Sequence, residues 1–153
     1  MPRIYVLPVT HEDDLAVIRP LCERFFLEAG YPGCLDWDHF STFWKRMIEM
    51  DMGRIYVSRG EHGHIAGVLG AMFIRNPFNG WPMTALSFWY VAPEFRGLRC
   101  GPALFDRAEE DGLARGNKMM LASHLFAINK DGGKRFFERK GFENHELGYR
   151  KIY

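Results

Sequence analysis

The apolar residues of this 153-residue chain follow two different spacings. Short apolar runs bounded by turn residues indicate strands, and apolar residues that recur every three or four positions indicate helices. Together they predict the order strand–helix–helix–strand–strand–strand–helix–strand–helix–strand. We expect strands at 3–9, 54–59, 64–75, 83–91, 119–124 and 142–153, and helices at 10–30, 36–48, 102–116 and 134–140.

Glycine and proline mark the expected ends of these elements. Pro20 conflicts with the first helix, because proline lacks a backbone donor, and it is expected to kink or split that helix. Residues 60–63 and the pair Asn79-Gly80 are typical of hairpin turns, so the three central strands should form an antiparallel meander. Asp131-Gly132-Gly133 is expected to be a flexible loop. Gly141 is well placed to cap the last helix.

The second helix carries an aromatic face with two interpretations. One broad side holds Trp37, Phe40, Phe43, Trp44, Met47 and Ile48. An apolar helical face usually packs against a core, and this is the favoured interpretation. In the alternative, some of these rings line a pocket for a substrate.

Composition and charge narrow the class of protein. With 47% hydrophobic and 15% aromatic residues, the chain can bury a substantial core, and its length suits one domain covering 1–153. Its 20 basic and 19 acidic residues give a net charge of +1, which disfavours a nucleic-acid binder. No apolar run approaches the roughly 18 residues of a membrane span, and the N-terminus lacks the apolar core of a signal peptide. Three cysteines without ligand spacing suit the cytoplasm.

A metal site is not expected. His62 and His64 form a His-x-His pair, but no third ligand stands at a suitable spacing. The two histidines are therefore interpreted as part of a solvated turn.

One stretch, from Leu86 to Gly116, combines features of an anion site. A strand is followed by Arg96-Gly97-Leu98-Arg99-Cys100-Gly101 and then by a helix that Pro102-Ala103-Leu104 is expected to open. Glycines allow close approach of a ligand to the backbone, and a helix N-terminus offers unpaired N–H groups and a positive dipole end. With two arginines, this stretch predicts a cradle for phosphate or pyrophosphate.

The same stretch resembles the cofactor signature of the GNAT family of N-acetyltransferases, Gln/Arg-x-x-Gly-x-Gly/Ala. Arg96 matches its first position and Gly101 its last, while Arg99 stands where the middle glycine is usual. An arginine lacks the backbone freedom of that glycine. With the following Ser-His and Phe-Phe-Glu-Arg-x-Gly-Phe segments, the pattern is similar to bacteriophage-type members. The order of elements extends the resemblance over nearly the whole chain.

The resemblance implies a fold and a cofactor. The fold is an α/β (α+β) GNAT-like domain, with a mixed, mostly antiparallel sheet, a splayed parallel strand pair and flanking helices. The cosubstrate is acetyl-CoA, whose pyrophosphate the loop would bind and whose pantetheine arm would pair with the strand edge at Tyr90-Val91. The cofactor-binding residues implied are Tyr90, Val91, Arg96, Gly97, Leu98, Arg99, Cys100, Gly101, Pro102, Ala103, Asn129 and Phe137.

A small number of residues are candidates for catalytic roles. The backbone at Tyr90-Val91 would stabilise the oxyanion, with the Tyr90 side chain a weaker catalytic candidate. His124, at the end of the fifth strand, is the candidate base or proton relay, against the alternative of a structural histidine. Asn129 either touches the cofactor arm or caps a helix. Phe137 replaces the family tyrosine that protonates the thiolate, so water or another residue would supply that proton. Cys100 is interpreted as packing or contacting the cofactor, in preference to acting as a nucleophile.

Two functions follow from this pattern. The first is transfer of an acetyl group from acetyl-CoA to a primary amine by direct attack in a ternary complex. The second, motivated by Phe137, is an acyl-CoA-binding or interaction domain with little or no turnover. The acceptor is a small molecule or a protein, the chain has the features of neither a nucleic-acid nor a membrane binder, and a homodimer is possible.

Overall fold

The computed structural model describes residues 5–9, 12–60, 62–123, 126–145 and 148–153. The chain separates into two compact units, Met1–Ser123 and His124–Tyr153, and each is described by itself. Among the described residues, no helix is long and apolar enough to cross a membrane.

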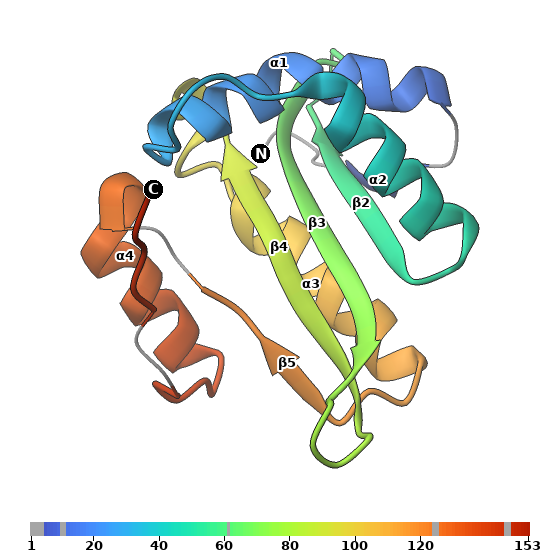
Figure 1. The fold of residues 1–153 in the computed structure, drawn as a ribbon. Helices are drawn as coiled ribbons and strands as arrows, with labels where there is room; N and C mark the ends of the chain where they lie inside the picture. Colours follow the sequence, from blue (N-terminus) through green and yellow to red (C-terminus); the bar gives the residue numbers. More distant parts are fainter. Residues whose placement is uncertain (1–4, 10–11, 61, 124–125, 146–147) are drawn as a thin grey trace. The chain divides into compact units, whose positions relative to one another are not determined.

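The first unit is built on a five-stranded mixed sheet with the strands in sequence order (Figure 1). Its strands are β1 (Tyr5–Pro8), β2 (Gly53–Arg59), β3 (Ile65–Arg75), β4 (Pro82–Val91) and β5 (Met119–Leu121). The first four pair antiparallel, and β4 pairs parallel with β5. The expected meander and parallel last pair are confirmed, although β5 is shorter than the expected 119–124.

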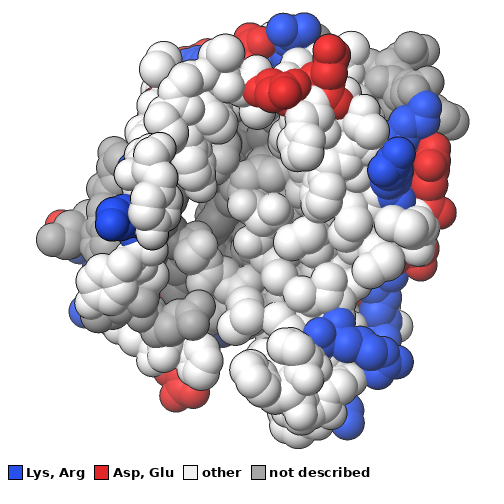
Figure 2. Space-filling model, in the orientation of Figure 1, with Lys and Arg blue, Asp and Glu red and all other residues white. Residues whose placement is uncertain are grey.

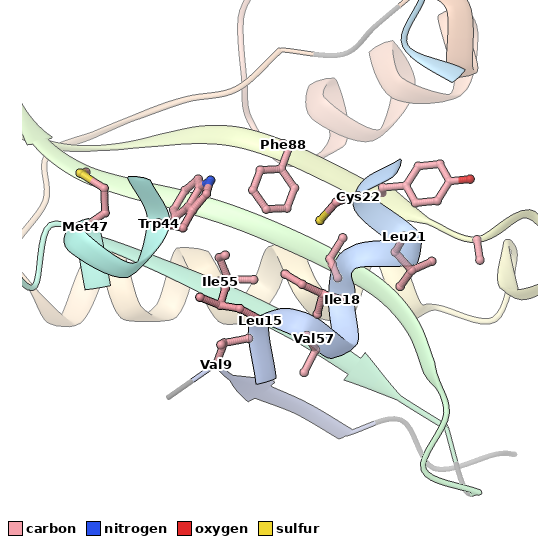
Figure 3. Close-up of a cluster of buried hydrophobic side chains, with 13 residues drawn as sticks. Val9, Leu15, Ile18, Leu21, Cys22, Trp44, Met47, Ile55, Val57 and Phe88 are labelled. Atoms are coloured by element: carbon pink, nitrogen blue, oxygen red, sulfur yellow. The ribbon is translucent and has the colours of Figure 1, made fainter. Parts of the chain in front are cut away.

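Helices cover both faces of this sheet (Figure 1). Helices α1 (Glu12–Glu28) and α2 (Trp37–Glu49) lie on one face and α3 (Cys100–Ala114) on the other. Under α1 and α2 is an apolar cluster centred on Ile18, Trp44 and Phe88 (Figure 3). Leu104 and Ala108 of α3 pack with a second buried cluster on the opposite face. Since successive strand residues point to opposite faces, β4 contributes Phe88 and Tyr90 to the first cluster and Trp89 to the second.

Helix α1 runs through Pro20 without interruption, so the expected split is wrong. Pro20 cannot donate to the carbonyl of Ala16 one turn earlier. Both residues are exposed. Water can therefore replace the missing hydrogen bond, and burial of Leu15, Ile18 and Cys22 holds both halves of the helix on the sheet.

The aromatic face of α2 packs mainly as core. Asp36 caps this helix by accepting a hydrogen bond from the backbone N–H of His39 at 2.9 Å. Trp44 is buried, and Phe40 packs against the same cluster. Phe43 instead is 41% exposed. The core interpretation is confirmed for most of the face, and a substrate-pocket role remains a prediction.

The turns follow the sequence signals. Gly63 and Gly80 have positive φ in the two hairpin connections, as turn glycines commonly do. His62 and His64 are exposed, and His64 stacks on Phe95 with ring centroids 4.8 Å apart. In Figure 2 the described acidic and basic side chains alternate along the side of the molecule, without a broad patch of one sign on the visible face.

The second unit differs from expectation in two respects. Helix α4 spans Phe126–Arg139 and includes Asp131-Gly132-Gly133, which were expected to form a loop. Gly141 has a φ of 83° after the helix, as expected of a cap. The described residues after Gly141 form no strand, so the strand expected at 142–153 is wrong. Tyr149 and Ile152, three positions apart, would face opposite sides of a strand, and both are exposed.

Candidate functional site

Strand β4 is paired along one edge and only partly along the other. The parallel pairing with β5 covers Met83–Ala85, and β5 ends there. The pairing with β3 continues to Val91, after a bulge between Leu86 and Phe88. Within the described sheet, the segment 86–91 thus has no strand on its β5 side.

The backbone groups on that open edge can be assigned from the ladder. The Ala92 N–H donates to the Ala66 carbonyl of β3 at 3.0 Å. Because the groups that face a given neighbour alternate along an antiparallel strand, the N–H and C=O groups of Trp89 and Val91 point toward the open edge. The resemblance implies oxyanion and pantetheine contacts in this segment, at Tyr90-Val91. Val91 does face the open edge, whereas the backbone groups of Tyr90 face β3, so that half of the expectation is wrong.

The loop after β4 forms a turn with available donors. A short 3-10 helix (Pro93–Phe95) precedes it, and α3 begins at Cys100. Gly97 has a φ of 86° and is exposed. Among the described residues, the N–H groups of Gly97, Arg99 and Gly101 donate to no backbone acceptor. Such N–H groups beside a helix N-terminus are suited to binding an anion.

Pro102 lies at the third position of α3, so the expectation that Pro102-Ala103-Leu104 opens the helix is off by two residues. Its missing donor costs nothing there, because the N–H groups of the first turn have no intrahelical partner. Ala103 donates to the Arg99 carbonyl at 3.0 Å, and Leu98 is 46% exposed at the outside of the loop. The candidate anion-binding segment is therefore residues 96–101, which includes the first two residues of α3.

Arg99 stands where the family motif usually has a glycine, and it adopts a backbone conformation typical of glycine. It caps α3 with φ 63° and ψ 5°, in the left-handed region. That conformation costs a non-glycine residue about 1–2 kcal/mol. The arginine therefore does adopt the backbone conformation of a glycine, and it keeps this strain in an exposed loop.

Cys100 is buried at the start of α3, and burial raises the pKa of its thiol. The thiol is thus kept protonated at neutral pH, although a helix N-terminus commonly has the opposite effect. A packing role, the preferred interpretation from the sequence, agrees with this environment.

A polar network joins the end of α1 to the open edge of β4. The Tyr90 hydroxyl donates to Oε1 of Glu28 at 2.5 Å, and the Arg96 guanidinium donates to Oε2 of Glu28 at 2.8 Å. The Nε of Arg96 also donates to the Val91 carbonyl at 2.9 Å, on the open edge. The guanidinium lies 5.4 Å from the centre of the Tyr90 ring. Arg96 thus contacts three groups at once.

The pKa values of the two ionisable residues that contact Arg96 are shifted in opposite directions. Burial and the hydrogen bond to Glu28 raise the pKa of Tyr90 to about 12, so Tyr90 stays protonated at neutral pH. Burial alone would raise the pKa of Glu28, but the hydrogen bonds from Tyr90 and Arg96 and the charges of Arg96 and Arg24 hold it below its ordinary value. Glu28 is therefore an ionised hydrogen-bond acceptor.

A second ion pair, Arg24–Glu94, connects α1 to the same segment as the pair Glu28–Arg96. Both guanidinium NH2 groups of Arg24 donate to Glu94, at 3.0 and 3.1 Å. The hydrogen bond from Arg24 lowers the pKa of Glu94 to about 2. Arg24 and Glu28 are one helical turn apart on α1, so two pairs connect this helix to the segment after β4.

Glu28→Gln is expected to reduce stability at pH 7 by about 1 kcal/mol, since it removes one charge from a partly exposed network. The folded-state pKa of Glu28 is lowered, so its contribution is present above the unfolded pKa, about 4.3, and is lost as the pH falls through the folded value. Urea unfolding of both proteins between pH 7 and 3.5 should show the difference shrinking at the acid end. A constant or widening difference would contradict the assignment.

Other residues selected from the sequence lie in the second unit. His124 lies outside the described residues. Asn129 lies inside α4, so it is not the cap of that helix. Phe137 is buried in α4 against the ring of Phe142, whose centre is 5.3 Å away. Their predicted roles remain predictions.

Sequence reasoning missed Glu28, Arg24 and Glu94. Glu28 stands at the end of an amphipathic helix in no recognisable motif, and its partners are 62 and 68 residues away. Only the i, i+4 spacing of Arg24 and Glu28 is visible locally, and it would suggest a helix-surface pair. The structure shows that each instead pairs with a residue after β4.

Comparison with known proteins identifies the family and the fold. The model of the acetyltransferase (GNAT) family matches residues 13–142. The finer resemblance to bacteriophage-type members is not supported by these matches. No curated protein is significantly similar to the chain in sequence.

Solved acetyltransferase structures have the same fold at low sequence identity. A predicted acetyltransferase with acetyl-CoA from Clostridium acetobutylicum has a TM-score of 0.78 at 13% identity, with 99% of this chain and 96% of the other covered. An aminoglycoside N-acetyltransferase in complex with CoA gives 0.76 at 18% identity, covering 99% and 96%. Glucosamine-6-phosphate N-acetyltransferase from Arabidopsis thaliana gives 0.75 at 16%, covering 99% of both chains.

Proposed function

Because the chain belongs to the acetyltransferase (GNAT) family, we propose that it transfers an acetyl group from acetyl-CoA to a primary amine. The observation that carries the proposal is the combination of an open β4 edge with an adjacent loop of unpaired N–H groups. The first suits an extended arm that pairs like an added strand, and the second suits a pyrophosphate. Solved relatives of this fold contain CoA or acetyl-CoA, which supports the same cofactor here.

The residues present fit this cofactor. Arg96 and Arg99 would supply positive charge, and the N–H groups of Gly97, Arg99 and Gly101 would supply hydrogen bonds. The cofactor would bring an acetyl group activated as a thioester. The chain itself would offer the outward-pointing groups of Trp89 and Val91 to orient the arm. The cofactor-binding roles of Asn129 and Phe137, which the resemblance implies, and the role of His124 as base or proton relay are part of the same proposal.

The acceptor amine attacks the acetyl carbonyl directly in a ternary complex, forming a C–N bond while the C–S bond breaks. The amine loses a proton, for which His124 is the proposed relay, and the leaving thiolate takes up a proton from water, because Phe137 has none to give. Known members of this fold act on aminoglycosides and on glucosamine 6-phosphate, which supports a small-molecule amine. A single catalytic domain in the cytoplasm, acting alone or as a homodimer, is part of this proposal.

A second candidate is an acyl-CoA-binding domain without turnover. It is favoured by one observation: the position of the family tyrosine is Phe137, buried among the apolar rings of Phe136 and Phe142. The two candidates share cofactor binding and differ only in transfer.

We expect CoA to stabilise the protein against heat and urea. A ligand at 100 times its dissociation constant adds about 2.7 kcal/mol to the free energy of unfolding, which raises the Tm of a domain of this size by about 5–10 °C. The measurement is differential scanning fluorimetry with CoA and acetyl-CoA, with ATP and NAD at equal concentration as controls.

The absence of a shift at millimolar CoA, or a larger shift with ATP or NAD, would overturn the proposal. A CoA shift without acetyl transfer to a panel of primary amines would favour the binding domain over the enzyme.

A further inference from the structure

Arg96 occupies groups that the proposed function requires to be available. Its Nε donates to the Val91 carbonyl, at 2.9 Å, which lies on the edge proposed for the cofactor arm. Its terminal nitrogen donates to Glu28 at 2.8 Å. Arg96 is also a proposed phosphate ligand, so binding of the cofactor would draw its charge away from the carboxylate. In the cofactor-free structure, Arg96 therefore occupies one backbone acceptor of the open edge, the Val91 carbonyl.

Release of Arg96 would leave Glu28 with one oxygen free. Oε1 would keep its 2.5 Å hydrogen bond from Tyr90, and Oε2 would lose its hydrogen-bonded cation, with only the charge of Arg24 remaining nearby. The Glu28 side chain is only 32% exposed, so the carboxylate would be a partly buried charge beside the open edge of β4. An ionised carboxylate in that setting is stabilised by a new cation.

We propose that Glu28 binds a cationic group of the acceptor and that the Arg96 guanidinium fills this position until the cofactor binds. This inference rests on the proposed function, because it assigns the acceptor site of the same reaction. The ligand should share the chemistry of the Arg96 guanidinium that it replaces. A positively charged hydrogen-bond donor therefore fits against Oε2 of Glu28.

The bound cation is not the amine that reacts. A carboxylate contact favours the protonated form of an amine, and a protonated amine has no lone pair with which to attack. Glu28 therefore selects an acceptor that carries a second ammonium group beside the reacting one. The substrate class assigned is a small diamine or polyamine.

The neighbouring ion pair provides a matched control. Arg24–Glu94 connects the same helix to the same segment with hydrogen bonds of 3.0 and 3.1 Å, but does not contact the Val91 carbonyl. Glu94→Gln and Glu28→Gln remove the same charge from the same surface. Only Glu28→Gln removes the partner that holds Arg96 away from the cofactor.

Calorimetric titration of the full chain with CoA tests the release of Arg96. We expect Glu28→Gln to bind CoA about two- to fivefold more tightly than the wild type, which is the range of coupling for partly exposed ion pairs. Glu94→Gln should remain within about 1.5-fold of the wild type, apart from a general charge effect that both variants share. Equal or weaker binding by Glu28→Gln than by Glu94→Gln would overturn the inference. Wild-type protein that binds no CoA would overturn the proposed function itself.

Thermal shifts at saturating CoA test the acceptor class, with 1,5-diaminopentane and 1-aminopentane as probes. The wild type and Glu94→Gln should bind the diamine about five- to twentyfold more tightly than the monoamine, because a charged hydrogen bond is lost with the second ammonium. In Glu28→Gln this preference should disappear, while CoA binding remains. No preference in the wild type, or a preference that survives in Glu28→Gln, would overturn the assignment.

Discussion

Replacing Gly70 by alanine is expected to lower the free energy of unfolding by about 2 kcal/mol or more and the Tm by about 4–8 °C. A Cβ at this position would lie 2.3 Å from Cε1 of Phe88, its cross-strand neighbour, and 2.8 Å from two further ring atoms. The Phe88 ring is held by Trp44, with centroids 5.4 Å apart (Figure 3), and by Phe40, with centroids 5.6 Å apart. It cannot move aside without disturbing the core.

The lower conformational freedom of alanine in the unfolded chain opposes the clash with Phe88, but its effect on stability is smaller. Alanine restricts the unfolded chain more than glycine does, which stabilises a folded protein by about 0.4–1 kcal/mol where the new methyl group fits. Gly101→Ala isolates that effect, because its Cβ would meet Trp89 and Val91 at 3.4 and 3.5 Å, ordinary contact distances. Urea unfolding should show Gly101→Ala as stable as the wild type or slightly more so. Equal stability of Gly70→Ala and Gly101→Ala would refute the packing argument.

Replacing Arg99 by glycine is expected to change stability and cofactor binding in opposite directions. Relief of the left-handed strain, about 1–2 kcal/mol, should outweigh the greater freedom of glycine in the unfolded chain, about 0.4–1 kcal/mol, so the free energy of unfolding should rise by about 0.5–1 kcal/mol. Loss of the guanidinium should weaken CoA binding about 10- to 100-fold, as expected for a charge-assisted contact to phosphate. Urea unfolding and calorimetric titration with CoA give the two values.

Arg99→Ala separates the backbone from the side chain. Alanine retains the strain and lacks the guanidinium, so its stability should match the wild type while its CoA affinity falls as in the glycine variant. If both variants bind CoA as tightly as the wild type, the Arg99 side chain is directed to solvent and is not a phosphate ligand. A glycine variant no more stable than the wild type would show that the strain is compensated elsewhere.

Local chemistry explains which parts of the fold could be predicted. The hairpin turns and the mainly core-facing aromatic side of α2 depend on neighbouring residues and were predicted correctly. Helix α1 passes through Pro20 because burial of its apolar face outweighs one lost hydrogen bond, a balance that local sequence does not reveal. The strand expected after Gly141 is wrong: Tyr149, Ile152 and Tyr153 are all exposed, so burial of an apolar face does not stabilise a strand there.

The candidate site was predictable only where it follows a contiguous motif. Residues 96–101 are such a motif, and their loop with free N–H groups was expected. The left-handed backbone of Arg99 was not, since only the folded loop imposes it. Glu28 could not be identified at all, because its role depends on Tyr90 and Arg96, which the fold brings to the end of α1 from far along the chain.

The two halves of β4 differ in what their side chains and backbone must satisfy. In the first half, Thr84 is 2% exposed, accepts a hydrogen bond from Asn117 at 2.8 Å and lies within the three-residue parallel pairing. Beyond Ala85, one edge of the strand has no partner strand in the described sheet. Substitutions at residues 83–85 should therefore act on folding, whereas the backbone groups on the open edge of residues 89–91 are kept by any residue except proline.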